Sequence, residues 1–438
     1  MSKKYDLDKA PCGNWILDVP AKEEIHISDE DRAILRKLAR EMADFAALPL
    51  EDEKRKLWTD HNDLKDTRPL IFCDAENGWN EIIPSSRLTC KGELARDWER
   101  WFLKELCYAK DIKDDKVIEA VFYVPYAEVH HPKWGLEPIM KGDFEAGGSY
   151  TWEPPIKDLD NLDEYMAKMR YPIIEIDEER SNLYMDLAKD TFDGILEIKR
   201  RHKWWHGFYT TLDYADMRGL EELFYDFYDY PDEVHRLMAF FRDGYMNMLD
   251  QLEQKNLLQV NTGNTYIGTG GLGFTSQLPG PDKTPATCAD MWGNVASQEV
   301  SEISPEMFEE FCMPYEIPLM ERFGMSTYGC CEPVDRFWDS VKKVRNLRRV
   351  SVSAWANVKT MAEMLGKNYV YSYKPSPSPL AVASYSAEEA RPFFRDFLQQ
   401  TKGCHVELIM KDNHTLGGRP ENMFEWSKMV REEINKAF

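Results

Sequence analysis

Several features are missing from this sequence, and each absence excludes a class of protein. The nine cysteines are an odd number without a repeated spacing, so no disulfide framework is predicted. There is no run of about 18 apolar residues, and the first residues lack an apolar signal core. Positive net charge is missing too. With 77 acidic against 55 basic residues the formal net charge is -22, which repels nucleic acid and anionic membranes. We expect a soluble, cytoplasmic protein without nucleic-acid or membrane partners.

The glycine motifs of nucleotide-binding proteins are also absent. Gly268, Gly270, Gly271 and Gly273 follow a predicted strand, but their spacing fits neither the dinucleotide-binding fingerprint nor the P-loop. We interpret this segment as a flexible loop after a strand.

Aromatic residues, in contrast, are plentiful. They make up 13% of the 438 residues and include 13 Trp and 21 Tyr. Such a content favours either an apolar, aromatic-lined pocket or a large core that uses tryptophan. The length is sufficient for one large α/β domain or two smaller ones.

Strands alternate with helices along most of the chain. Ser28 and Asp31 are typical of a helix start and precede apolar residues at helical spacing, so residues 1–60 are predicted to form an N-terminal helical extension. Helices are predicted to begin at Pro231, Pro305 and Pro420. The predicted strands are 66–74, 117–129, 257–261, 323–330, 349–355, 369–373 and 404–410, and 203–208 is predicted to be the end of another. A long loop is predicted over 132–155. This alternation predicts a parallel sheet, and its many units favour an α/β fold of the (β/α)8 TIM barrel type over residues 61–438.

Polar residues that follow the predicted strands are candidates for the active face, because barrel active sites lie at the carboxyl ends of the strands. The candidates are His206, Asn261, Asn264, Cys330, Cys331, Glu332, Trp355, Lys411, Asp412, Asn413 and His414.

The adjacent thiols of Cys330 and Cys331, followed by Glu332, indicate a metal site. Neighbouring cysteines rarely bridge each other, and thiolate, imidazole and carboxylate are the ligands that zinc prefers. The alternative is that both cysteines are small buried hydrophobic residues, as free cysteine commonly is.

Four short segments together resemble the uroporphyrinogen decarboxylase superfamily: 66–69, the helix start at 231–234, the strand that ends at Cys330, and 403–422. The resemblance covers roughly residues 60 to 438, and it implies a (β/α)8 barrel. The superfamily includes porphyrinogen decarboxylases and zinc-dependent methyltransferases that exchange methyl groups with a corrinoid. The decarboxylases use arginines from an N-terminal loop, whereas residues 71–76 here are acidic and contain no arginine, which favours the methyltransferase branch.

The resemblance also implies a ligand set, with one departure. Methyltransferases of this branch carry a His-x-Cys pair on a strand, and Tyr328 stands here at the histidine position before Cys330. The implied zinc ligands are therefore Cys330, Cys331, Glu332 and His414. For catalysis the implied residues are Glu332, Lys411 and Asp412, and for substrate binding His206, Asn261, Asn264, Tyr328 and Trp355.

The implied reaction is the transfer of a methyl group from a methylated donor to a cobalamin or other corrinoid cofactor on a partner corrinoid protein. Zinc would act as a Lewis acid on the heteroatom of the donor. The aromatic content favours O-demethylation of a methoxylated aromatic. Methanol, methylamines and methylated thiols are left open, as is a homodimer. Two alternatives are a porphyrinogen-type decarboxylase and a non-catalytic barrel that binds a metal or a small ligand.

Overall fold

The computed structural model describes residues 18–142, 150–202, 204 and 207–438. Its largest sheet has six parallel strands in the order β1-β10-β9-β8-β7-β6. They are β1 (Leu70–Cys73), β6 (Trp292–Val295), β7 (Met325–Tyr328), β8 (Leu347–Val352), β9 (Val370–Tyr373) and β10 (His405–Met410). Nearly every residue of these strands is buried, as expected of a parallel sheet covered on both faces.

Two further ladders complete the described strands. Parallel strands β2 (Val121–Val124) and β5 (Glu197–Arg200) pair with each other. Strands β3 (Ile139–Gly142) and β4 (Tyr150–Glu153) pair antiparallel. The prediction of a loop over 132–155 was therefore wrong for this part, because two short strands pair there despite the surrounding proline and glycine.

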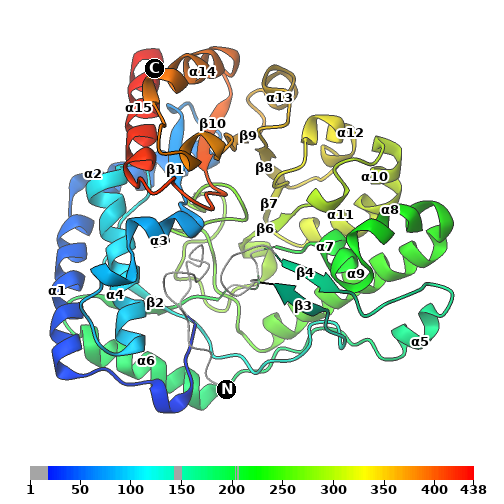
Figure 1. Cartoon of the computed structure of the whole chain (residues 1–438), viewed down its shortest axis with the longest axis horizontal. Coiled ribbons are helices and arrows are strands. Elements are labelled where there is room, and N and C mark those ends of the chain that lie inside the picture. The colour runs from blue at the N-terminus through cyan, green and yellow to red at the C-terminus, as the bar shows by residue number, and fades with distance from the viewer. Residues whose placement is uncertain (1–17, 143–149, 203, 205–206) are drawn as a thin grey trace.

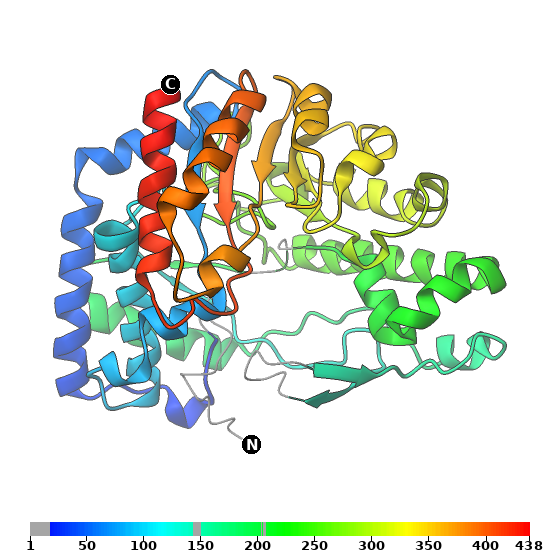
Figure 2. The same cartoon turned by 45° about the horizontal axis from the view of Figure 1, so that its top comes forward.

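The helices lie around the periphery of the strands (Figures 1 and 2). They are α1 (Asp29–Ala46), α2 (Pro49–Asn62), α3 (Trp79–Ile82), α4 (Glu93–Cys107), α5 (Leu162–Met166), α6 (Glu178–Phe192), α7 (Thr210–Arg218), α8 (Leu220–Asp229), α9 (Pro231–Gln254), α10 (Pro305–Phe311), α11 (Met313–Glu321), α12 (Trp338–Val341), α13 (Val358–Leu365), α14 (Ala387–Gln400) and α15 (Glu421–Ala437). The predicted α/β class is thereby confirmed. Closure of the strands into a (β/α)8 barrel stays a prediction.

Helix α1 begins at the position predicted from the sequence, directly after Ser28. The Ser28 hydroxyl accepts a hydrogen bond from the Asp31 amide at 3.1 Å, which satisfies a donor at the start of α1. Leu35 of α1 and Trp58 of α2 are fully buried in the same apolar core as the strands. The Trp58 indole also donates to the carbonyl of Asp115 at 2.7 Å, and so fixes α2 to the segment that leads into β2. No helix in the described ranges is both long enough and apolar enough to cross a membrane.

The segment 257–261 has no strand assignment, contrary to its prediction. Side chains hold it in place of a backbone ladder. The Asn261 amide donates to the Trp292 carbonyl at 2.9 Å and accepts from the Trp292 amide at 2.8 Å. On the other side, the Gln259 amide donates to the His202 ring at 2.8 Å. This segment therefore links the end of β5 with β6 through side-chain hydrogen bonds.

Candidate active site

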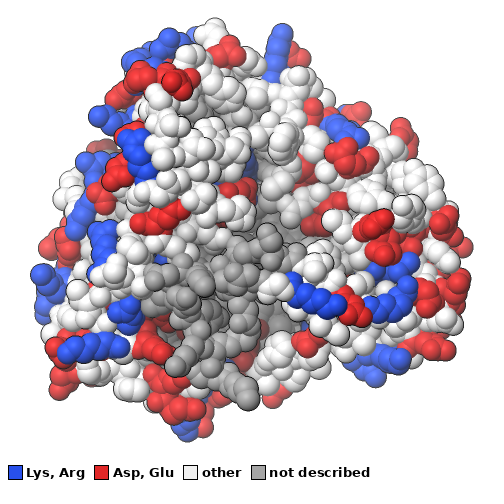
Figure 3. Space-filling model, in the orientation of Figure 1, with Lys and Arg blue, Asp and Glu red and all other residues white. Residues whose placement is uncertain are grey.

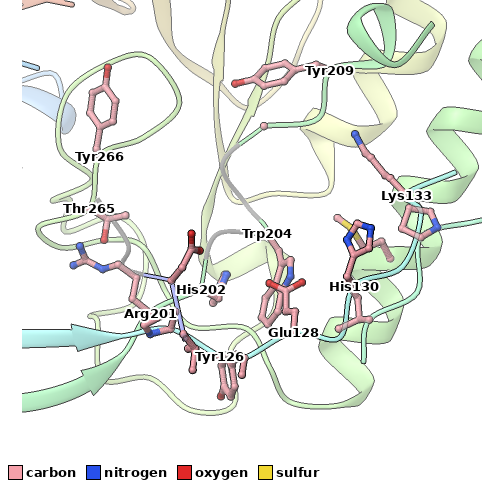
Figure 4. Close-up of a pocket in the computed structure, with 18 of the residues that line it drawn as sticks. Tyr126, Glu128, His130, Lys133, Arg201, His202, Trp204, Tyr209, Thr265 and Tyr266 are labelled. Carbon is pink, nitrogen blue, oxygen red and sulfur yellow. The ribbon is translucent and has the colours of Figure 1, made fainter. Parts of the chain in front are cut away.

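A cavity of about 1040 Å³ lies where the parallel strands β1, β2, β5 and β10 end. Its lining comes from the residues just beyond each strand: Asp74, Glu76 and Asn77 after β1, Pro125 to Val129 after β2, Arg201, His202 and Trp204 after β5, and Lys411 after β10. The loop after Asn264 adds Thr265, Tyr266, Gly268 and Thr269. Figure 4 shows part of this lining. The carboxyl ends of parallel strands are the usual position of active sites in α/β folds.

An amine and two thiols meet at one end of this cavity. Lys411 Nζ lies 4.0 Å from Cys330 Sγ and 2.6 Å from Asp412 Oδ1. Cys330 Sγ is 3.4 Å from Cys331 Sγ. Gly329 has a φ of 95°, so the chain can turn directly after β7 and bring both half-buried thiols to the same side.

The charges of this group depend on one another. The hydrogen bond between the two thiols raises the pKa of Cys330 and lowers the pKa of Cys331, so Cys331 is the more readily ionised thiol. Burial by itself would lower the pKa of Lys411, but its electrostatic interactions with the coupled thiol of Cys330 and with the Asp412 carboxylate outweigh burial and raise that pKa. Lys411 is therefore a fixed cation at this end of the cavity.

Glu76 is the cavity residue whose pKa best suits it to donate a proton near neutral pH. Burial raises the pKa of its carboxyl group from 4.5 to about 7, with a further contribution from the negative charge of Asp74. The nearby Lys411 cation opposes this rise. The Glu76 amide donates to Asp74 Oδ1 at 3.2 Å, which fixes the turn after β1. Near neutral pH, Glu76 is thus present in both protonation states, as general acids require.

Aromatic rings form much of the remaining lining. Trp204 stacks on Tyr126 with 5.8 Å between ring centroids and on His202 with 5.0 Å. Tyr266 packs against Phe72 of β1 at 5.2 Å. The Tyr209 hydroxyl accepts a hydrogen bond from the Asn294 amide at 2.9 Å. In Figure 4, Tyr209 and Tyr266 lie on one side of the cavity and Tyr126 and Trp204 on the other. Flat apolar ligands fit such walls.

The structure brings together some of the residues predicted from the sequence. Lys411 lines the cavity, with Cys330, Cys331 and Asp412 beside it. His414 is exposed, with its Nδ1 atom 3.5 Å from the Asn77 amide. His206 lies outside the described residues.

Other predicted residues have their polar atoms occupied by the fold. Glu332 is buried and accepts hydrogen bonds from the amides of Ser297 at 3.0 Å and Cys330 at 2.9 Å, so it holds the turn that carries the thiols. Asn261 is bonded to Trp292, as described above. The Asn264 amide donates to the Val117 carbonyl at 2.9 Å.

Two predicted aromatic residues are placed outside the cavity lining. Tyr328 is fully buried and donates to Glu316 Oε2 at 3.3 Å. The side chain of Trp355, in contrast, is 82% exposed.

A zinc site requires several donor side chains around one point. Among residues 18–142, 150–202, 204 and 207–438, no three His, Cys, Asp or Glu side chains are grouped so that they could hold a metal ion. The two thiols are close enough to share an ion, but the Glu332 carboxylate binds backbone amides and the Lys411 cation adjoins Cys330. The present arrangement does not fit zinc, and zinc stays a prediction of the resemblance.

Sequence reasoning anticipated an aromatic-lined pocket, with Trp204 among its walls, but missed Glu76, Arg201 and the tyrosines of the lining. Glu76 follows β1 in the same way that Lys411 follows β10, so the rule of polar residues at strand ends could have found it. Arg201 follows β5 directly and could have been found by the same rule. Nothing in the sequence shows that Tyr126, Tyr209 and Tyr266 face a common cavity.

Comparisons with known proteins add little to this description. No protein-family model matches the chain, and no curated protein matches it. Among solved structures, a methyltransferase from Methanosarcina mazei is similar, with 9% sequence identity and a TM-score of 0.45 over 86% of this chain and 97% of that one. A likeness of this degree identifies neither a family nor an activity for this chain.

Proposed function

We propose that this protein is a cytoplasmic methyltransferase on a (β/α)8 barrel, which transfers the methyl group of a methoxylated aromatic donor to a corrinoid on a partner protein. The observation that carries this proposal is the combination found in one cavity. Aromatic walls suited to a flat ring lie in the same space as a half-buried carboxyl group, Glu76, and a fixed cation, Lys411.

The difficulty of the reaction lies in the leaving group. An aryl methyl ether releases a phenolate only reluctantly, so its oxygen must be protonated or its charge stabilised as the bond to carbon breaks. In the proposed step the C–O electron pair goes to oxygen, and an electron pair of the acceptor forms the new bond to the methyl carbon. The Glu76 proton is transferred to the oxygen, and Glu76 later regains a proton from water. The products are the phenol and the methylated acceptor.

The remaining residues of this end position and support Glu76. Lys411 stabilises the negative charge that develops on the oxygen, and Asp412 holds the Lys411 ammonium at 2.6 Å. Glu332 acts indirectly, because it fixes the turn that places Cys330 beside Lys411. The aromatic walls align the donor and exclude water from the reacting atoms. No step is assigned to zinc, since the donor arrangement does not fit it.

The decarboxylase alternative has less support from the cavity. A polycarboxylate substrate needs several cations that are free to bind it. Three cavity cations already have carboxylate partners: Lys133 lies 2.5 Å from Asp213, Arg180 3.6 Å from Asp177 and Lys411 2.6 Å from Asp412.

The proposed function is tested with the Glu76→Gln variant and a reduced corrinoid under anoxic conditions. General acids commonly contribute about 100- to 10,000-fold to a rate, so we expect the variant to lose at least about 100-fold in methyl transfer from methoxyaromatics. Glu389→Gln makes the same chemical change on the exposed surface of α14 and is the matched control, expected to retain wild-type activity. Equal rates in wild type and Glu76→Gln would reject the assigned role of Glu76.

A further inference from the structure

One cavity-lining cation differs from the others. Lys133, Arg180 and Lys411 each have a carboxylate partner, as given above. Arg201 also lines the cavity, but within the described part of the chain no carboxylate lies within ion-pair distance of its guanidinium. On a chain of net charge -22, with acidic side chains spread over the visible face in Figure 3, an arginine without an acidic partner is notable.

The fold holds the Arg201 side chain in a defined position. The residue follows β5, and its amide donates to the Val124 carbonyl of β2 at 3.1 Å, so the backbone continues the β2–β5 ladder. Its guanidinium carbon lies 3.3 Å from the centroid of the Tyr123 ring. One terminal nitrogen donates to the Asn264 carbonyl at 3.1 Å.

These contacts occupy one face and one corner of the guanidinium, which carries five N–H donors in a planar fork. The other donors are available for a planar anion such as a carboxylate, which arginine binds through two parallel hydrogen bonds. Little side-chain freedom is lost on binding, because stacking on Tyr123 and the bond to Asn264 already restrict the group. In Figure 4, Arg201 lies beside Thr265 and His202, with Tyr126 and Trp204 nearby.

From this geometry we propose that Arg201 binds the carboxylate of the substrate, so that the donors are methoxylated aromatic carboxylates rather than neutral or cationic methoxyarenes. That the substrate carries a methoxy group rests on the proposed function. That Arg201 binds a carboxylate does not depend on it. The aromatic ring would lie between the walls formed by Tyr126, Trp204, Tyr209 and Tyr266. Arg201 is thereby a residue that determines specificity, and Glu76 the residue that acts at the methyl ether.

The test measures binding with benzoate and benzamide, which have the same shape but differ in charge. Both are titrated into the wild-type protein by calorimetry, without any methyl acceptor. A charge-assisted hydrogen bond contributes enough for an affinity ratio of about 10- to 100-fold, so we expect benzoate to bind that much more tightly than benzamide. We expect Arg201→Gln to remove this preference and Arg201→Lys to retain part of it.

Arg180→Gln is the matched control, because Arg180 also lines the cavity but is engaged by Asp177 and by the Glu128 carbonyl. It is expected to change the benzoate affinity less than about threefold, because the Asp177 carboxylate already balances its charge. Circular dichroism of each variant reports whether it folds. The comparison of the two ligands on the wild-type protein needs no variant, and equal binding there overturns the site even if Arg201→Gln does not fold.

The two proposals fail in different ways. Equal binding of benzoate and benzamide by the wild-type protein would overturn the carboxylate site. The same holds for a folded Arg201→Gln variant that keeps the preference. If benzoate binding depends on Arg201 but no methoxybenzoate donates its methyl group, the carboxylate site stands and the methyltransferase proposal falls. If methoxybenzene donates its methyl group as fast as methoxybenzoate does, the methyltransferase proposal stands and the carboxylate site falls.

Discussion

Glu316 on α11 provides a quantitative test of how this structure buries charge. The side chain is fully buried, accepts a hydrogen bond from the Ser297 hydroxyl and receives another from Tyr328. Burial raises its pKa from 4.5 to about 8, and the neighbouring charge of Glu332 adds to the rise. At neutral pH Glu316 is therefore protonated in the folded protein and ionised in the unfolded chain.

The sign of the pH dependence follows from these two values. Below pH 4.5 Glu316 is protonated in both states and contributes no pH dependence. Between pH 4.5 and about 8 only the unfolded state loses the proton, so the free energy of unfolding decreases by about 1.4 kcal/mol per pH unit. Over this interval the stability lost is on the order of 5 kcal/mol.

The perturbation is Glu316→Gln, which stays neutral at every pH. Urea unfolding of wild type and variant is measured at intervals from pH 4 to pH 9. We expect the difference in unfolding free energy to shift in favour of the variant by about 4 to 5 kcal/mol across this range, because other titrating groups cancel in the difference. Glu389→Gln on the surface of α14 is the control. Wild-type and Glu316→Gln curves that stay parallel would refute this account of the buried carboxyl group.

Three further predictions concern the site and the core. For Glu76, whose pKa is about 7, we expect kcat/KM for methyl transfer to fall about tenfold per pH unit above pH 7, and a profile flat to pH 9 would contradict its role as an acid. Replacing Arg349, which lies 3.0 Å from Glu407 with both side chains fully buried, by methionine should reduce the unfolding free energy by about 3 to 5 kcal/mol. The double variant Arg349→Met/Glu407→Gln should recover part of this loss in urea titrations, and no recovery would reject the pairing. Finally, we expect methyl transfer to survive dialysis against a zinc chelator. Loss that is restored by zinc would support the ligand set implied by the resemblance.

Much of the fold could be predicted because its signals are local. The proline-started helices α9 and α15 were predicted at Pro231 and Pro420, and α15 begins at Glu421. Strands β7 to β10 lie within the predicted ranges or within two residues of them, since buried parallel strands are short apolar runs with clear ends. Segment 257–261 shares that composition but is held by the side chains of Asn261 and His202, and pairing of this kind leaves no pattern in the sequence.

The site could be predicted only in part, for a physical reason. The strand-end rule brought Lys411 and Cys330 to the same place, where the structure puts them 4.0 Å apart. The rule cannot show which polar atoms the fold itself uses. Glu332 and Asn261 satisfy backbone groups, and such hydrogen bonds depend on turns that only the folded chain reveals. The same rule applies to Glu76 after β1, but the raised pKa of its carboxyl group depends on burial and on Asp74, which only the folded chain shows.

The most direct test of the central claim is a methyl-transfer assay with the purified protein, a reduced corrinoid, a corrinoid partner protein and a panel of methylated donors under anoxic conditions. Formation of the methylated corrinoid is followed by absorbance. We predict transfer from methoxybenzoates, and none from methylamines or methyl thioethers. Failure of every methoxyaromatic to donate its methyl group, with the partner protein and added zinc present, would contradict the proposed function.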